Sequence, residues 1–275
     1  MRATARVVAE PDGHGGTRLA VLRGEAPLLL RRTVPAVREG TGGLPADVHL
    51  VGGAAGPLGG DDLSLVIEVR AGAALRMHTV AASLALPGPT GAPSRTRITA
   101  TVEGGGYLAW LPEPLIAATG CLHWTESTVD IDSDARLLWR EELICGRYGE
   151  APGDARLSMA VTRGTRPLLV QNLAIGPGSV GWDGAAVLDR AGAVGSLLVV
   201  EPAWVASGPP PARVLGPTAA LLPLAGPAVL ASVIGTDAHQ VRACLEGIVE
   251  ELSPGRLVPE RPGSVVTAST NAGTA

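Results

Sequence analysis

Residues 104–150 read GGGYLAWLPEPLIAATGCLHWTESTVDIDSDARLLWREELICGRYGE. This stretch holds three of the five Trp, both Tyr and two of the three Cys, in a chain that is only 3% aromatic and lacks Phe. Because large aromatic side chains dominate packing where they occur, their concentration here predicts the densest part of the molecule. Glutamates stand beside arginines in the same stretch, so we expect functional residues here too.

The strand expected at 135–145 carries bulky side chains on both faces, because residues two apart share a face. One face is formed by Leu137, Trp139, Glu141, Leu143 and Cys145, and the other by Leu138, Arg140, Glu142 and Ile144. Glu141 therefore stands among apolar neighbours, where a carboxylate needs a partner, most simply an Arg, or a role that justifies its cost. Both a structural Glu–Arg pair and a carboxylate lining an internal passage for a cation fit this pattern.

A strand–turn–strand unit recurs around this stretch, over residues 63–86, 95–116, 127–146 and 156–175. The bulky residues Met77, Trp110 and Trp139 fall at matching places, at intervals of about 30 residues, as in stacked repeats. Two arrangements remain open from this periodicity: a meander of hairpins, or strands coiled into a stack whose units bury their faces against each other.

The flanking segments extend the β-rich pattern. Residues 1–35 predict two or three strands, with Ala3, Ala5, Val7 and Ala9 on one face. Leu122 and Trp124 fall on even positions and Val129 and Ile131 on odd ones, which predicts a β-bulge near Glu126. Pro35 to Gly43 is expected to be a loop.

The C-terminal third predicts more mixed structure. A short helix is expected at 184–194, then strands at 196–205 and 218–234. A longer helix follows at 236–252, with Thr236 as its N-cap. Its apolar stripe consists of Val241, Cys244, Leu245, Ile248, Val249 and Leu252. We therefore expect one β-rich domain over 1–252 and a disordered tail over 253–275.

Composition excludes several classes of function. The net charge is −4, the chain contains no Lys, and no concentrated basic face is visible, which argues against nucleic-acid binding. No signal peptide and no apolar run long enough to span a membrane is visible. Three unpatterned Cys favour a reducing compartment, so a cytoplasmic location is expected.

The glycine-rich run from Gly52 to Gly60 is not a nucleotide-binding P-loop. Such a loop continues into Gly-Lys-Ser/Thr, whereas this one continues into Asp61 and Asp62, whose charges repel a triphosphate. The run is either a flexible connector or a tight turn that presents Asp61 to a partner or a metal ion.

Cys121 and His123 lie two residues apart on an expected strand and share a face. A thiolate with an imidazole is suited to Ni or Zn, but two ligands make an incomplete site, and ordinary packing explains the pair equally. The other histidines, at 14, 49, 78 and 239, are scattered singly, and no Ser–His–Asp arrangement stands out.

Four motifs in this chain resemble the urease accessory protein D family. They are Gly59-Gly60-Asp61, the Thr-x-x-Ala segment Thr79 to Ala82, Leu-x-Trp-Leu-Pro-Glu with Trp110, Pro112 and Glu113, and a final block from Trp139 containing Glu141, Gly146, Arg147, Gly149 and Glu150. The chain departs from the family in a shorter loop after Arg147 and in having Leu84 and Leu86 where an aromatic residue is common.

The resemblance implies a mainly β fold, with strands wound into a helical, β-helix-like stack and about two α-helices, one near the C-terminus. It implies a non-enzyme that binds apo-urease and, with an F-type accessory protein and a G-type GTPase, helps to deliver Ni²⁺. Nickel would pass transiently through its interior. No tightly bound cofactor, nucleotide, nucleic acid or membrane partner is expected.

The resemblance and the residue pattern together suggest Asp61, Glu141 and Glu142 as nickel-passage carboxylates, with Cys121 and His123 as a second pair. The remaining motif residues, Gly59, Gly60, Trp110, Pro112, Glu113, Gly146, Arg147, Gly149 and Glu150, are expected to shape turns or partner contacts. The rival hypotheses are a carbohydrate-active hydrolase or lyase that uses two carboxylates, and a β binding module without a metal role.

Overall fold

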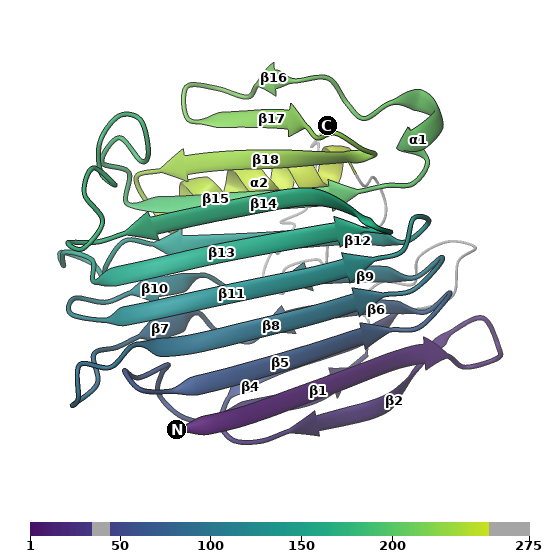
Figure 1. The fold of residues 1–275 in the computed structure, drawn as a ribbon, viewed down its shortest axis with the longest axis horizontal. Helices are drawn as coiled ribbons and strands as arrows, with labels where there is room; N and C mark the ends of the chain where they lie inside the picture. Colours follow the sequence, from purple (N-terminus) through teal and green to yellow (C-terminus); the bar gives the residue numbers. More distant parts are fainter. Residues whose placement is uncertain (35–44, 253–275) are drawn as a thin grey trace, which may run out of the picture.

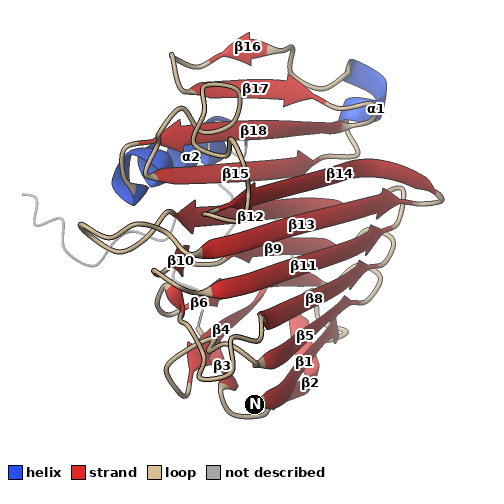
Figure 2. Ribbon diagram, turned by 60° about the vertical axis from the view of Figure 1, so that its left-hand side comes forward, coloured by secondary structure: helices blue, strands red, loops and turns tan. Residues whose placement is uncertain are grey.

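The computed structural model describes residues 1–34 and 45–252, and most of them lie in strands (Figures 1 and 2). The strands are β1 Arg2–Pro11, β2 Thr17–Gly24, β3 Leu28–Thr33, β4 Ala46–Gly52, β5 Asp62–Val69, β6 Ala74–Thr79, β7 Ser83–Ala85, β8 Ser94–Val102, β9 Tyr107–Leu111, β10 Leu115–Ala117, β11 Leu122–Ile131, β12 Arg136–Ile144, β13 Asp154–Arg163, β14 Arg166–Ile175, β15 Ala193–Val200, β16 Arg213–Val214, β17 Ala219–Pro223 and β18 Ala228–Gly235. The helices are α1 Trp204–Ser207 and α2 Ala238–Leu252. The tail expected at 253–275 and the loop expected at 35–43 lie outside the described residues.

The strands form two sheets that face each other. The first sheet has the order β14-β13-β11-β8-β5-β1-β2, and the second β16-β17-β18-β15-β12-β9-β6-β4-β3, with β7 and β10 beside it. One continuous core lies between them, built from side chains of both, including Ile67 and Val129 of the first sheet and Met77 and Trp139 of the second.

The coiled arrangement is confirmed, because successive strands alternate between the two sheets. The chain passes from β5 to β6, from β8 to β9 and from β11 to β12, and equivalent strands pair in parallel within each sheet. Met77 lies opposite Trp110, and Trp110 opposite Trp139, so each coil stacks its bulky residue on the next. Only the fourth unit differs, because β13 and β14 form an antiparallel hairpin.

The alternation predicted for β1 is confirmed, since Ala3, Ala5, Val7 and Ala9 are all buried. The bulge predicted near Glu126 is wrong. β11 pairs with β8 and β13 without any shift of register, and its inward positions carry His123, Ser127, Val129 and Ile131. Leu122 and Trp124 point outward instead, and the guanidinium of Arg95 covers the Trp124 ring at 4.5 Å. The inner face of β11 is therefore polar at its start.

The helix predicted at 184–194 is also wrong. Residues 184–192 form turns and bends, with Asp189 and Arg190 at positive φ of 47° and 62°, a conformation that a right-handed helix excludes, and β15 begins at Ala193. The strand expected at 196–205 ends early, because β15 ends at Val200, two residues before Pro202. The first helix, α1, overlaps the end of that expected strand and continues to Ser207.

The C-terminal helix α2 is confirmed, although Asp237 rather than Thr236 accepts the capping bond, from the backbone N–H of Gln240 at 2.9 Å. Its buried side chains are Val241, Leu245, Ile248 and Val249, and they pack on the second sheet over β15, β18 and β12. Neither described helix has the length and apolar character required to cross a membrane.

Candidate functional site

Polar side chains line the inner face where β11 begins. His123 is 1% exposed, and its Nδ1 lies 2.8 Å from Ser94 Oγ while its Nε2 lies 3.0 Å from Thr125 Oγ1. Burial lowers the pKa of His123 to about 4, so the imidazole is neutral at physiological pH. Ser127 follows on the same face. Hydroxyls and a neutral imidazole thus enter an otherwise apolar interior.

Glu141 of β12 lies opposite this polar row. Its Oε1 accepts hydrogen bonds from Ser127 Oγ at 2.9 Å and from Trp139 Nε1 at 3.1 Å. Burial raises the pKa of Glu141, and these two neutral donors offset only part of the desolvation. Of the two interpretations left open for Glu141, the structural Glu–Arg pair is not observed among the described residues, because both of its hydrogen-bond partners are uncharged.

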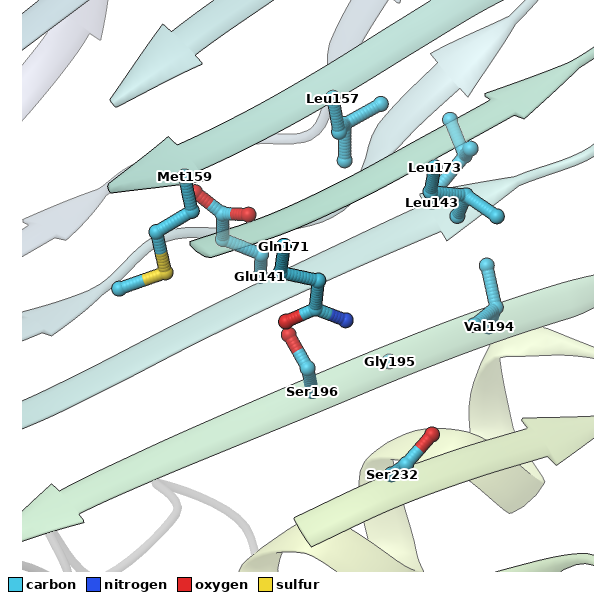
Figure 3. Close-up of a pocket in the computed structure, with 10 residues that line it drawn as sticks. All are labelled: Glu141, Leu143, Leu157, Met159, Gln171, Leu173, Val194, Gly195, Ser196 and Ser232. Atoms are coloured by element: carbon cyan, nitrogen blue, oxygen red, sulfur yellow. The ribbon is translucent and has the colours of Figure 1, made fainter. Parts of the chain in front are cut away.

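Glu141 lines two cavities, and Leu157 lines both as well. The larger cavity, of about 450 Å³, is bordered by the polar residues Thr96, His123 and Thr125 and by apolar residues of both sheets. The smaller, of about 30 Å³, has room for about two water molecules. Its polar lining comes from Gln171 of β14, Ser196 of β15 and Ser232 of β18 (Figure 3). Glu141 therefore borders both spaces.

The second sheet is interrupted beside Glu141. β9 pairs with β12 only as far as Trp110 opposite Trp139, and β10 resumes at Leu115 opposite Leu143. The Pro112–Pro114 segment leaves the ladder between these points. The two prolines lack the N–H that would continue it. The break leaves one side of β12 without backbone partners at residues 140–142.

A charge network surrounds this break on the outer face. Glu142 pairs with Arg140 at 2.9 Å and with Arg242 of α2 at 2.7 Å, while Arg242 also pairs with Glu113 at 3.0 Å. Arg140 Nη2 donates to the carbonyl of Pro112 at 3.1 Å. Glu141 and Glu142 thus face opposite sides of β12, as strand geometry requires, and only Glu142 has Arg partners.

Asp61 lies in a different place and lines neither cavity. It is 5% exposed and accepts hydrogen bonds from the Leu58 N–H at 2.9 Å and the Met1 amino group at 2.6 Å. The preceding glycines are structural: a Cβ on Gly59 would lie 2.5 Å from the backbone N of Gly88, and Gly60 has a φ of +93°. The Gly-Gly-Asp motif therefore folds a turn in which Asp61 is already bonded.

Cys121 and His123 are both buried but have separate partners. The thiol of Cys121 lies 3.7 Å from the Asp154 carbonyl oxygen, and burial raises the pKa of this thiol to about 11. A thiol with so high a pKa is a poor source of the thiolate that a metal needs. Across residues 1–34 and 45–252, no group of three or more His, Cys, Asp or Glu is arranged to hold a metal ion.

The closing turn of the last motif is held by Arg147 and Glu150. The Arg147 guanidinium, 2.5 Å from the carboxylate, lowers the pKa of Glu150 to about 2, and Glu150 also accepts the Thr119 N–H at 3.0 Å. Gly146 and Gly149 adopt positive φ of 89° and 70°. These four motif residues shape an exposed turn.

Two histidines expected to be isolated lie together on the outer face of the second sheet. The rings of His49 and His78 stack with centroids 5.2 Å apart. Burial lowers the pKa of His78 to about 4, which keeps this pair from carrying two positive charges.

Several site residues were missed at the sequence level. Ser127 was obscured by the supposed bulge, and a continuous strand would have placed it inward with His123. Gln171, Ser196, Ser232 and Arg242 carry no local signal, because only the packing of distant strands and of α2 brings them to the site.

Comparison with known proteins supports the motif resemblance. The family model described as UreD urease accessory protein matches residues 1–263. A urease accessory protein UreD 3 of Streptomyces griseus is 47% identical over 92% of this chain and 97% of its own length. UreD proteins of Streptomyces avermitilis and Frankia alni are 44% and 42% identical over 92% and 91% of this chain, covering 98% and 93% of their own lengths.

Proposed function

Because this chain belongs to the UreD urease accessory protein family, we propose that it is a scaffold that binds apo-urease and conducts Ni²⁺ to it. In this proposal an F-type accessory protein and a G-type GTPase complete the complex, in the cytoplasm. The chain itself is an accessory protein and not a catalyst, so the nickel ion is its cargo and no resident cofactor is needed.

The observation that carries the proposal is the position of Glu141. An ionised carboxylate between two sheets costs free energy unless a cation or strong donors compensate it. Its two neutral donors, Ser127 and Trp139, leave much of its capacity to attract a cation unused. A passing divalent ion supplies the missing charge, and carboxylate oxygen with retained water suits transient binding.

The two cavities support a route past this carboxylate. On one side an ion meets Thr96, Thr125 and the neutral His123, and on the other Gln171, Ser196 and Ser232. All of these groups are uncharged and offer lone pairs, so they replace hydration water without holding the ion tightly. Asp61 lies away from this route, and its proposed role is to maintain the turn after Gly60.

The test removes the charge of Glu141 while nearly preserving the size of the side chain. In cells that co-express urease and its accessory proteins at limiting nickel, we expect Glu141→Gln to reduce active urease while pull-down of urease subunits is unchanged. Glu126→Gln, on the outward face of β11 with a half-exposed side chain, is the matched control. Equal urease activity for wild type and Glu141→Gln would contradict the passage role.

The carbohydrate-active alternative loses its main support in the structure. A glycosidase needs two carboxyl groups flanking one bond, about 5–9.5 Å apart. Glu141 faces the interior, whereas Glu142 faces outward and is neutralised by Arg140 and Arg242. A plain binding module is the remaining alternative, and failure of the chain to capture urease subunits would favour it.

A further inference from the structure

The larger cavity reaches the outer face of the second sheet at the break between β9 and β10. Its lining includes Glu141 and His123 from the inner side and Glu113 and Glu142 from the outer side of the same sheet. The absence of backbone pairing beside residues 140–142 explains how one cavity meets both faces. The proposed passage therefore has a lateral mouth, and two carboxylates stand at it.

Arg242 of α2 places its guanidinium between these carboxylates. Its Nε lies 2.7 Å from Glu142 Oε1, and its Nη1 and Nη2 lie 3.0 and 3.3 Å from the two oxygens of Glu113. Bidentate pairing of this kind is strong and directional. The positively charged guanidinium of Arg242 thus occupies the position between Glu113 and Glu142.

Glu142 keeps unused binding capacity. Its side chain is 2% exposed, and its Oε2 has no hydrogen-bond partner among the residues described, although both Arg140 and Arg242 contact Oε1. A buried carboxylate oxygen without a donor is costly and is rarely retained without a reason. A metal ion or its water ligand would satisfy this oxygen.

Resting on the proposed function, we infer that Glu113 and Glu142 form a divalent-cation site at the lateral mouth, for which Arg242 is the built-in competitor. An arriving ion exchanges with the guanidinium, and the guanidinium returns when the ion moves inward to Glu141. Two carboxylates without this competitor would hold a divalent ion and slow its release. Arg242 is thus a positioning residue that sets the affinity of the mouth.

The test is Arg242→Gln in the complex of this chain with its accessory partners, with Ni²⁺ binding measured by equilibrium dialysis. We expect Ni²⁺ to bind at least about tenfold more tightly, because losing about 1.4 kcal/mol of competition gives that factor, and urease activation at limiting nickel to slow. Arg213→Gln, which removes another Arg that pairs with α2 through Glu251, is the control. The double variant Glu113→Gln/Arg242→Gln should lose the gain in affinity.

Unchanged nickel affinity in a folded Arg242→Gln complex would overturn the inference. Should that variant not fold, Glu113→Gln alone tests the inference. We expect this variant to reduce urease activation at limiting nickel and excess nickel to restore it. Urease activation that does not depend on the nickel concentration in this way would overturn the inference. The two proposals fail separately. A Glu141→Gln defect together with no effect at Arg242 rejects only the mouth, whereas no Glu141→Gln defect rejects the passage itself.

Discussion

At the residue scale, Glu141 shows a mismatch: its carboxyl group is buried, but its two hydrogen-bond donors are neutral and offset only part of the desolvation. The sequence was sufficient to predict that this carboxylate lies among apolar neighbours, because both faces of β12 carry bulky side chains. The sequence was insufficient to predict the hydrogen-bond donors of Glu141, since Ser127 comes from the other sheet. The same limit applies to Arg242 and Glu113, which are 129 residues apart.

This mismatch predicts a pH dependence of stability. Burial raises the pKa of Glu141 above its ordinary value of 4.5, so the folded state holds this proton at pH values where the unfolded state has released it. Stability from this group is therefore present below about pH 4.5 and falls as the pH rises towards the folded-state pKa, by at most about 1.4 kcal/mol per pH unit.

Glu141→Gln removes this titration, so the variant should become more stable relative to wild type as the pH rises from 4.5 towards the folded-state pKa. Urea unfolding at a series of pH values measures the difference. Glu126→Gln should stay within about 0.5 kcal/mol of wild type throughout. A pH-independent difference for Glu141→Gln would show that this carboxyl titrates normally.

At the scale of elements, periodicity predicted the repeated strands, but the predictions of a bulge near Glu126 and of a helix at 184–194 were wrong. The recurrence of Met77, Trp110 and Trp139 has a direct cause, because each occupies the same place in successive coils. The bulge near Glu126 was inferred from the assumption that Leu122 and Trp124 must point inward. Arginines cover Trp124 on the outer face instead. The 184–194 segment contains good helix formers, but tertiary context overrides propensity in so short a stretch.

The docking of α2 makes a prediction of its own. Gly195 lies under the helix, and a Cβ there would be 2.6 Å from Val241 Cγ1 and 2.8 Å from Leu245 Cδ1. Gly195→Ala should therefore displace α2 and cost about 1–3 kcal/mol, with faster hydrogen exchange of the α2 amides. Gly247→Ala, on α2 with no atom within 4 Å of its Cβ, should be neutral or stabilising. Unchanged α2 exchange in Gly195→Ala would contradict this packing.

At the scale of the whole molecule, the coiled sheets enclose a core that is aliphatic and aromatic over most of its length but polar around Glu141. The motifs were sufficient to predict the family and the stack. The proposed route could not be predicted from the sequence, because the residues that would line it come from β11, β12, β14, β15 and β18, and because Pro112–Pro114 interrupts the second sheet beside it. Cavities form between elements, and local sequence carries no record of them.

The central claim is that nickel passes between the sheets beside Glu141. Its most direct test is the initial rate at which radiolabelled nickel moves from a loaded G-type partner into apo-urease within the assembled complex. We predict that Glu141→Gln lowers this rate by about tenfold or more, the factor that corresponds to about 1.4 kcal/mol of lost cation attraction, while complex assembly stays intact. Equal transfer rates for the wild-type and Glu141→Gln complexes would contradict the account.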